Sequence, residues 1–176
     1  VRICLVSKAA PRIPPRPGIP VTIYIHSLAQ ELALLGNEVD VVCAPLLYKE
    51  RQIYNIIEVG KLRFFERAKN TYLQNLYELW YSLLLGISLG NLQRRNRYDV
   101  IHFFEAPATA FLALVFAKKG GPPFIFSTGR PVSGEKLEWE SQDTPLLIRL
   151  ASDIMHLYVF RRVDMVTTSS YRLRDV

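Results

Sequence analysis

The chain has 176 residues, of which 49% are hydrophobic and 22% are charged, and its formal net charge is +6. This composition excludes a disordered or collagen-like chain, and the length is typical of one domain with a core of its own. The positive charge favours an anionic partner, but nucleic acid is disfavoured because the sequence carries no helix-turn-helix, zinc-finger or RNA-binding motif.

The two cysteines, Cys4 and Cys43, each lie in an apolar run, which is typical of buried free thiols and predicts a reducing, cytoplasmic compartment. The chain opens directly on a strand-like run, so we expect no secretory signal. Its longest charge-free runs, 79–93 and 106–117, are shorter than the ~20 residues that a membrane-spanning helix needs. We therefore expect no transmembrane segment.

Apolar runs rich in branched residues predict buried strands at 3–6 and 39–43. Between them, the spacing of apolar residues predicts a helix over 21–35 that ends at Gly36. The rest of the chain alternates in the same way. Further strands are predicted at 56–59, 62–65, 99–104, 124–128 and 163–168, and further helices at 72–91, 106–118 and 144–161. The predicted fold class is α/β: a Rossmann-like, doubly wound, mainly parallel sheet in a single domain.

The loop after the first strand, 7–20, is a candidate anion site, because ligands of such sheets bind beyond the carboxyl ends of the strands. It leads into a helix N-terminus, where free amides and the helix dipole attract negative charge, and Gly18 and Ile19 can offer amides. A solvated basic loop is the alternative, because prolines contribute no N–H. The loop matches no dinucleotide or P-loop motif. Its basic residues are Lys8, Arg12 and Arg16.

Four segments in order along the whole chain resemble one known family, the retaining family-4 glycosyltransferases of the GT-B fold. They are the opening strand 1–7, the helix end Leu-Ala-x-x-Leu-Ala-x-x-Gly-x-Glu-Val at 28–39, Asp-Val-Ile-His at 99–102, and Val-Asp-x-Val-x-x-x-Ser at 163–170.

The resemblance implies a two-domain enzyme that transfers a hexosyl group from a nucleotide-diphosphate sugar to a lipid or glycan acceptor, with retention. Residues 1–176 would form the N-terminal, acceptor-side domain. A C-terminal nucleotide-sugar domain, absent from this chain, would hold most of the donor, so the fragment alone is expected to be inactive. Since a strand has just ended and Ser170 resembles a helix N-cap, we expect the polypeptide to continue past Val176.

The family's glycine-loop amides approach the donor phosphates, and Gly18 and Ile19 occupy the matching positions, with Lys8 and Arg16 beside them. Ile19 departs from the Gly-Gly that the family often has. The resemblance also matches Gly129 to a family histidine near the sugar, so the catalytic residues stay unassigned. The predicted acceptor or cleft residues are Arg12, His102, Glu105, Thr128, Gly129, Arg130 and Ser170.

Some of these residues have simpler interpretations. Glu105 follows a strand and can touch an acceptor hydroxyl or the sugar, but His102 lies within a strand, where a histidine is more often a satisfied core residue. Arg130 can also be a solvated surface charge. No metal or other cofactor is expected, because Asp-x-Asp is missing and the three histidines lack zinc spacing. Amides and basic side chains would then stabilise the leaving diphosphate.

Two further patterns leave alternatives open. Gly86-Ile87-Ser88-Leu89-Gly90 matches the G-x-S-x-G elbow of α/β serine hydrolases, with Ser88 as nucleophile, but that elbow requires a preceding strand and 78–85 has helical character. The stretch 61–97 mixes basic and aromatic residues, which favours peripheral contact with an anionic membrane on its cytoplasmic face. Its alternative is a crossover helix that buries its apolar stripe. A non-catalytic ligand- or membrane-binding domain is the other function that the sequence allows.

Overall fold

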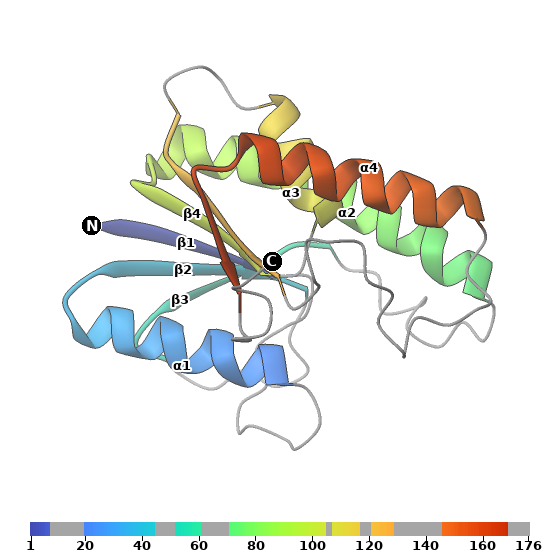
Figure 1. Ribbon diagram of the computed structural model, residues 1–176. Helices are drawn as coiled ribbons and strands as arrows, with labels where there is room; N and C mark the ends of the chain where they lie inside the picture. The colour runs from blue at the N-terminus through green and yellow to red at the C-terminus, as the bar shows by residue number, and fades with distance from the viewer. Residues whose placement is uncertain are drawn as a thin grey trace.

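The computed structural model describes residues 1–7, 20–44, 52–60, 71–104, 107–116, 121–128 and 146–168. Strands and helices alternate through these residues, as Figure 1 shows. The elements are β1 (Arg2–Ser7), α1 (Pro20–Leu34), β2 (Glu38–Cys43), β3 (Asn55–Glu58), α2 (Thr71–Asn96), β4 (Val100–Phe104), α3 (Pro107–Phe116), β5 (Phe124–Thr128), α4 (Leu146–Arg162) and β6 (Met165–Thr168). The strand predicted at 62–65 lies outside the described residues.

The six strands form one sheet in the order β3-β2-β1-β4-β5-β6, and every neighbouring pair is parallel. The chain moves outward from β1 through β2 to β3, then returns through α2 to the other side of β1. The winding direction therefore changes between β1 and β4, where Ser7 pairs with Phe104 at the carboxyl end. The predicted Rossmann-like, doubly wound parallel sheet is confirmed.

The two faces of the sheet carry different helices. α1 lies on one face, called here the α1 face, and α2, α3 and α4 form a helical layer on the other (Figure 1). Strand alternation sends Leu5 to the α1 face, beside Ile25 and Ala29 of α1, while Cys4 and Val6 face the helical layer. Because both faces are covered at β1 and β2, their apolar runs are continuous rather than alternating.

α2 contains the G-x-S-x-G motif and residues 71–96 of the mixed basic and aromatic stretch, whose residues 61–70 lie outside the described residues. It connects β3 to β4 and buries Tyr81, Leu85 and Leu89 in the core, so the crossover-helix interpretation of this segment is confirmed. The G-x-S-x-G motif lies in the interior of the same helix. No strand-to-helix turn presents Ser88, so the serine hydrolase alternative is wrong. A Cβ on Gly86 would lie 3.1 Å from the Cβ of Leu112, which shows that this glycine permits close approach of α3.

The ends of α1 and α2 are formed differently. Gly36 follows α1 with φ of 84°, and the N–H of Asn37 donates to the carbonyl of Leu32 at 3.2 Å, a Schellman cap of the predicted kind. α2 runs to Asn96 rather than to 91, and Arg97 follows it in the left-handed region at φ of 51°. Within the described residues, no helix is both long and apolar enough to cross a bilayer.

Candidate functional site

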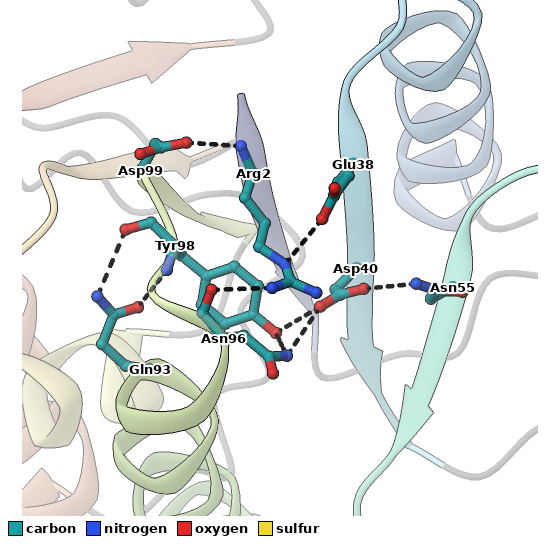
Figure 2. Close-up of polar contacts among 8 residues, drawn as sticks. All are labelled: Arg2, Glu38, Asp40, Asn55, Gln93, Asn96, Tyr98 and Asp99. Atoms are coloured by element: carbon teal, nitrogen blue, oxygen red, sulfur yellow. Dashed lines mark hydrogen bonds and ion pairs between the residues drawn. The ribbon is translucent and has the colours of Figure 1, made fainter.

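A cluster of polar side chains lies at the amino-terminal ends of the strands, beside the C-terminus of α2 (Figure 2). We call this end of the sheet the amino edge and the opposite end, where the strands finish, the carboxyl edge. Its centre is Asp40 of β2, which is 3% exposed. One carboxyl oxygen accepts from the Tyr98 hydroxyl at 2.7 Å and from Asn96 Nδ2 at 3.1 Å, and the other accepts from Asn55 Nδ2 at 3.0 Å. Burial, together with the nearby Cys4, raises the pKa of Tyr98, so its hydroxyl is a donor at neutral pH.

Arg2 extends this cluster along the same edge. Its Nη1 donates to the last carbonyl of α2, that of Asn96, at 3.0 Å, where the negative end of the helix dipole favours a cation. Its backbone N–H donates to Asp99 at 2.7 Å, and its Nε forms an ion pair with Glu38 at 3.2 Å. Ligands of doubly wound sheets bind at the opposite edge. We therefore assign this amino-edge cluster a structural role.

At the carboxyl edge, aromatic rings gather on the α1 face beside the point where the winding changes. The Tyr24 ring of α1 meets the Phe104 ring edge-on at 5.8 Å between centroids, and the His102 ring lies 4.1 Å from that of Phe104. Phe104 is buried, whereas Tyr24 is more than half exposed. These three rings form an aromatic cluster beside β4, one of the two central strands of the sheet.

From His102, a row of hydrogen-bonded side chains crosses the three strands β4, β5 and β6. His102 Nε2 lies 2.7 Å from Ser127 Oγ, and Ser127 Oγ lies 2.5 Å from Thr167 Oγ1. We call these three residues the polar row. Burial lowers the pKa of His102 to about 4, so its ring is neutral at pH 7. The row therefore offers uncharged donors and acceptors, which suit hydroxyl groups better than phosphates.

The residues predicted from the sequence separate into two groups. His102 and Thr128 are described, and they lie on opposite faces of the sheet: His102 on the α1 face, and Thr128, by strand alternation from Phe126, on the face of the helical layer, where it is buried. Nine predicted positions lie outside the described residues. These are Lys8, Arg12, Arg16, Gly18, Ile19, Glu105, Gly129, Arg130 and Ser170.

Three residues of the described carboxyl edge were not predicted: Tyr24, Ser127 and Thr167. For Ser127 and Thr167 a signal exists, because each begins a pair of polar residues that ends a strand with an apolar start. Their alignment depends on the register that pairs Ser127 with Thr167, and this register follows from the folded sheet. Tyr24 carries no comparable signal, since an aromatic residue in a helix is usually core.

Other buried polar groups do not build a second site among the described residues. His26 Nδ1 and the Tyr54 hydroxyl are 2.7 Å apart and hydrogen-bonded to each other, and burial raises the pKa of Tyr54 to about 12, so the tyrosine keeps its proton at neutral pH. The Thr109 hydroxyl, in the first turn of α3, is buried without a partner. Across the part of the chain that is described, no three acidic, histidine or cysteine residues are grouped as metal ligands.

The chain matches the family model described as Glycosyltransferase Family 4 over residues 21–176. None of the curated protein sequences is significantly similar to it. Solved structures share its fold at low sequence identity. A sucrose-phosphate synthase from Thermosynechococcus elongatus has a TM-score of 0.59 at 15% identity, covering 95% of this chain and 47% of that one.

Two other solved structures give similar values. A UDP-N-acetylglucosamine 2-epimerase from Rickettsia bellii has a TM-score of 0.55 at 10% identity, with 99% of this chain and 40% of that one covered. The glycotransferase of kitacinnamycin has a TM-score of 0.52 at 16% identity, with 92% of this chain and 38% of that one covered. The chain thus spans less than half the length of each of these proteins.

Proposed function

Because the chain belongs to glycosyltransferase family 4, we propose that it is the N-terminal, acceptor-side domain of an enzyme that transfers a hexosyl group from a nucleotide-diphosphate sugar, with retention. The acceptor is a lipid or a glycan, and a second, C-terminal domain holds most of the donor. The observation that carries the proposal is the family match, which extends over both halves of the sheet from α1 to its last strand.

The donor phosphates are proposed to lie at the loop before α1. α1 begins at Pro20, a residue well suited to the first position of a helix, so the dipole of a 15-residue helix points at the preceding residues. Gly18 and Ile19 would offer backbone amides there, and Lys8 and Arg16 would add positive charge. This position adjoins the change of winding between β1 and β4, where doubly wound sheets leave a crevice for ligands.

The acceptor is proposed to lie over the β4, β5 and β6 half of the carboxyl edge. A neutral His102 and the hydroxyls of the polar row favour a hydroxyl-bearing ligand on that side. Loop residues that follow these strands would complete the pocket. They are Glu105, Gly129, Arg130 and Ser170, with Arg12 from the first loop, whereas Thr128 ends β5 with its side chain buried on the opposite face from His102.

In the proposed transfer, the acceptor oxygen forms a bond to the anomeric carbon as the bond from that carbon to the diphosphate breaks. The electron pair of the broken bond stays with the diphosphate, and an oxygen of the departing diphosphate takes the proton of the acceptor hydroxyl. The protein contributes electrostatic stabilisation of the departing charge through amides and basic side chains, with no metal required. We place the enzyme in the cytoplasm, at the periphery of a membrane when its acceptor is a lipid.

The test uses the full-length protein and a panel of nucleotide-diphosphate sugars. Thermal stabilisation by one donor, and release of the nucleoside diphosphate only when an acceptor is added, would support transfer. The double variant Lys8→Ala/Arg16→Ala should weaken donor binding by about tenfold or more, because two cations near the phosphates are lost. Arg94→Ala/Arg95→Ala, which removes two exposed charges from α2, is the matched control and should leave it unchanged.

Other outcomes would contradict the proposal. Donor binding without turnover under any acceptor would favour the non-catalytic binding domain instead. Conversion of the donor with no acceptor consumed would indicate a different reaction on the sugar.

A further inference from the structure

The outward face of the helical layer carries several exposed apolar side chains. Six of them are between 47% and 58% exposed, and they come from all three helices of the layer. They are Trp80 and Ile87 of α2, Val115 of α3, and Leu150, Ile154 and Leu157 of α4. α3 packs against both α2 and α4, so the three helices that carry these residues form one continuous layer (Figure 1).

On α2, the exposed residues form a stripe that changes character along the helix. Trp80, Ile87 and Arg94 are spaced seven residues apart, a spacing that returns to nearly the same side of a helix with a drift of about 20° per step. The stripe starts with two apolar side chains and ends with exposed arginines, Arg94 and the adjacent Arg95.

α4 repeats this arrangement. Leu150, Ile154, Leu157 and Arg161 follow one another at spacings of four, three and four residues, which places them on one side of the helix over about 16 Å. Arg162 adds a second exposed cation at the same end. One exposed acidic side chain, Asp153, lies beside the stripe.

Both stripes run in the same direction. α2 ends just before β4 begins and α4 ends just before β6 begins, so the arginine ends lie at the amino edge of the sheet. The apolar ends therefore point toward the carboxyl edge, where the acceptor is proposed to bind. The face has apolar side chains near the proposed site and four arginines away from it.

We propose that this outward face, composed of the six apolar residues and Arg94, Arg95, Arg161 and Arg162, docks on an anionic phospholipid surface. A face that carries both apolar side chains and cations has the composition that binds the interfacial region of a bilayer, where leucine and tryptophan enter and arginine contacts lipid phosphates. Each arginine near such a surface contributes about fivefold to binding. The chain's net charge of +6 has the complementary sign.

A second copy of the chain fits this face less well. In a two-fold pairing, each arginine end would meet either the partner's arginine end or its apolar end. The first arrangement brings like charges together, and the second buries cations without partners, which is costly. A lipid surface can bind both ends at once, because its phosphates contact the arginines while the acyl chains next to them accept the apolar side chains.

The inference rests on the proposed function in one respect: a lipid acceptor gives the docked enzyme its substrate beside the carboxyl edge. The two are tested separately. Vesicle binding is measured without donor or acceptor, whereas donor binding and transfer to a soluble acceptor analogue are measured without vesicles.

The first experiment is cosedimentation of the full-length protein with vesicles of phosphatidylglycerol and phosphatidylcholine. The triple variant Leu150→Gln/Ile154→Gln/Leu157→Gln should lower the partition coefficient by roughly tenfold or more, because partly exposed apolar surface is lost. Its matched control is Leu34→Gln/Leu35→Gln/Ile53→Gln, which changes three apolar residues outside the helical layer that are at least as exposed and should bind as the unchanged protein does. Circular dichroism verifies that both variants are folded.

The second experiment removes charge with Arg94→Gln/Arg95→Gln/Arg161→Gln/Arg162→Gln. Binding should fall by about a hundredfold or more at low salt and lose most of its salt dependence. Equal binding to pure phosphatidylcholine vesicles, or equal loss in the control variant, would overturn the proposal. So would self-association in sedimentation velocity that the triple variant abolishes, since the face would then be a contact between copies.

Discussion

The two edges of the sheet use buried polar groups in opposite ways. At the amino edge, Asp40 accepts from three side chains and the ends of α2, β2 and β3 are tied together by them. At the carboxyl edge, the polar row links three strands through a neutral histidine and two hydroxyls, and it lies beside a half-exposed tyrosine. The position of a buried polar group in the fold, as well as its chemistry, therefore determines whether the group stabilises the fold or can bind a ligand.

Among changes that test this difference between the two edges, Asp40→Ala is expected to have the largest effect on stability. The change leaves the buried Tyr98 hydroxyl without its acceptor and removes the partly buried hydrogen bonds from Asn55 and Asn96, so the free energy of unfolding should fall by about 3 kcal/mol. Urea denaturation at pH 7 measures it. Glu38→Ala, which breaks only a largely exposed ion pair with Arg2, should cost less than about 1 kcal/mol. If Asp40→Ala folded normally but abolished donor binding, the structural role of the amino edge would be wrong.

His102 provides the next effect, a dependence of stability on pH. Its pKa is about 4 in the folded protein and about 6.5 in the unfolded chain, so between these values the unfolded state binds more protons. Its contribution is present above pH 6.5 and is lost as the pH falls toward 4. From pH 7.5 to pH 5 the loss should be about 2 kcal/mol. The variant His102→Gln should lack this part of the slope, and an unchanged slope would show that the histidine is not held neutral.

Much of the fold was predictable because its signal is local. The strands at 39–43 and 124–128 and the helix over 21–35 follow from apolar periodicity, and Gly36 marks the end of that helix as a glycine in the left-handed region. The end of α2 was not predictable in this way, since the predicted helix stopped at 91 whereas α2 ends at Asn96. Its last turn is polar and basic, and its cap uses the Gln93 side chain, whose oxygen accepts from the Tyr98 N–H at 3.0 Å.

A smaller effect is expected at the carboxyl edge from Ser127→Ala. Removing the hydroxyl separates His102 from Thr167, which should lower the free energy of unfolding by about 1 kcal/mol. If the row supports the acceptor pocket, the KM for the acceptor should rise while donor affinity stays constant. Ser127→Thr, which retains a hydroxyl, should recover part of the loss. An altered donor affinity with an unchanged acceptor KM would place the row on the donor side.

The smallest expected effect is an increase in stability, and it comes from a change at the amino edge. Arg97 has φ of 51°, a conformation that a non-glycine residue adopts at a cost, so Arg97→Gly should stabilise the protein by about 0.5 kcal/mol. The comparison variant Arg95→Gly, within the last turn of α2, should instead destabilise it by about 0.5 to 1 kcal/mol. Thermal unfolding separates the two signs. Neither change should alter donor binding if the amino edge is purely structural.

The site was less predictable than the fold because its geometry depends on contacts between distant segments. Asp40 looks like a polar interruption in an apolar strand, and its partners lie 15, 56 and 58 residues along the chain. His102 and Thr128 were grouped because both are near strand ends, but strand alternation sends them to opposite faces. The polar row required the register of three strands, which side-chain periodicity alone does not supply.

Both cysteines of the chain are buried within strands, and burial raises the pKa of the Cys4 thiol above its usual range and that of Cys43 to about 12. Thiolate, the reactive form, is therefore scarce at both positions under ordinary conditions. The folded domain should show almost no background with maleimide or nitroxide reagents. A single cysteine introduced at Leu157 or Leu35 would then carry a fluorophore or spin label at one known point, which makes the domain a convenient object for distance and immersion-depth spectroscopy.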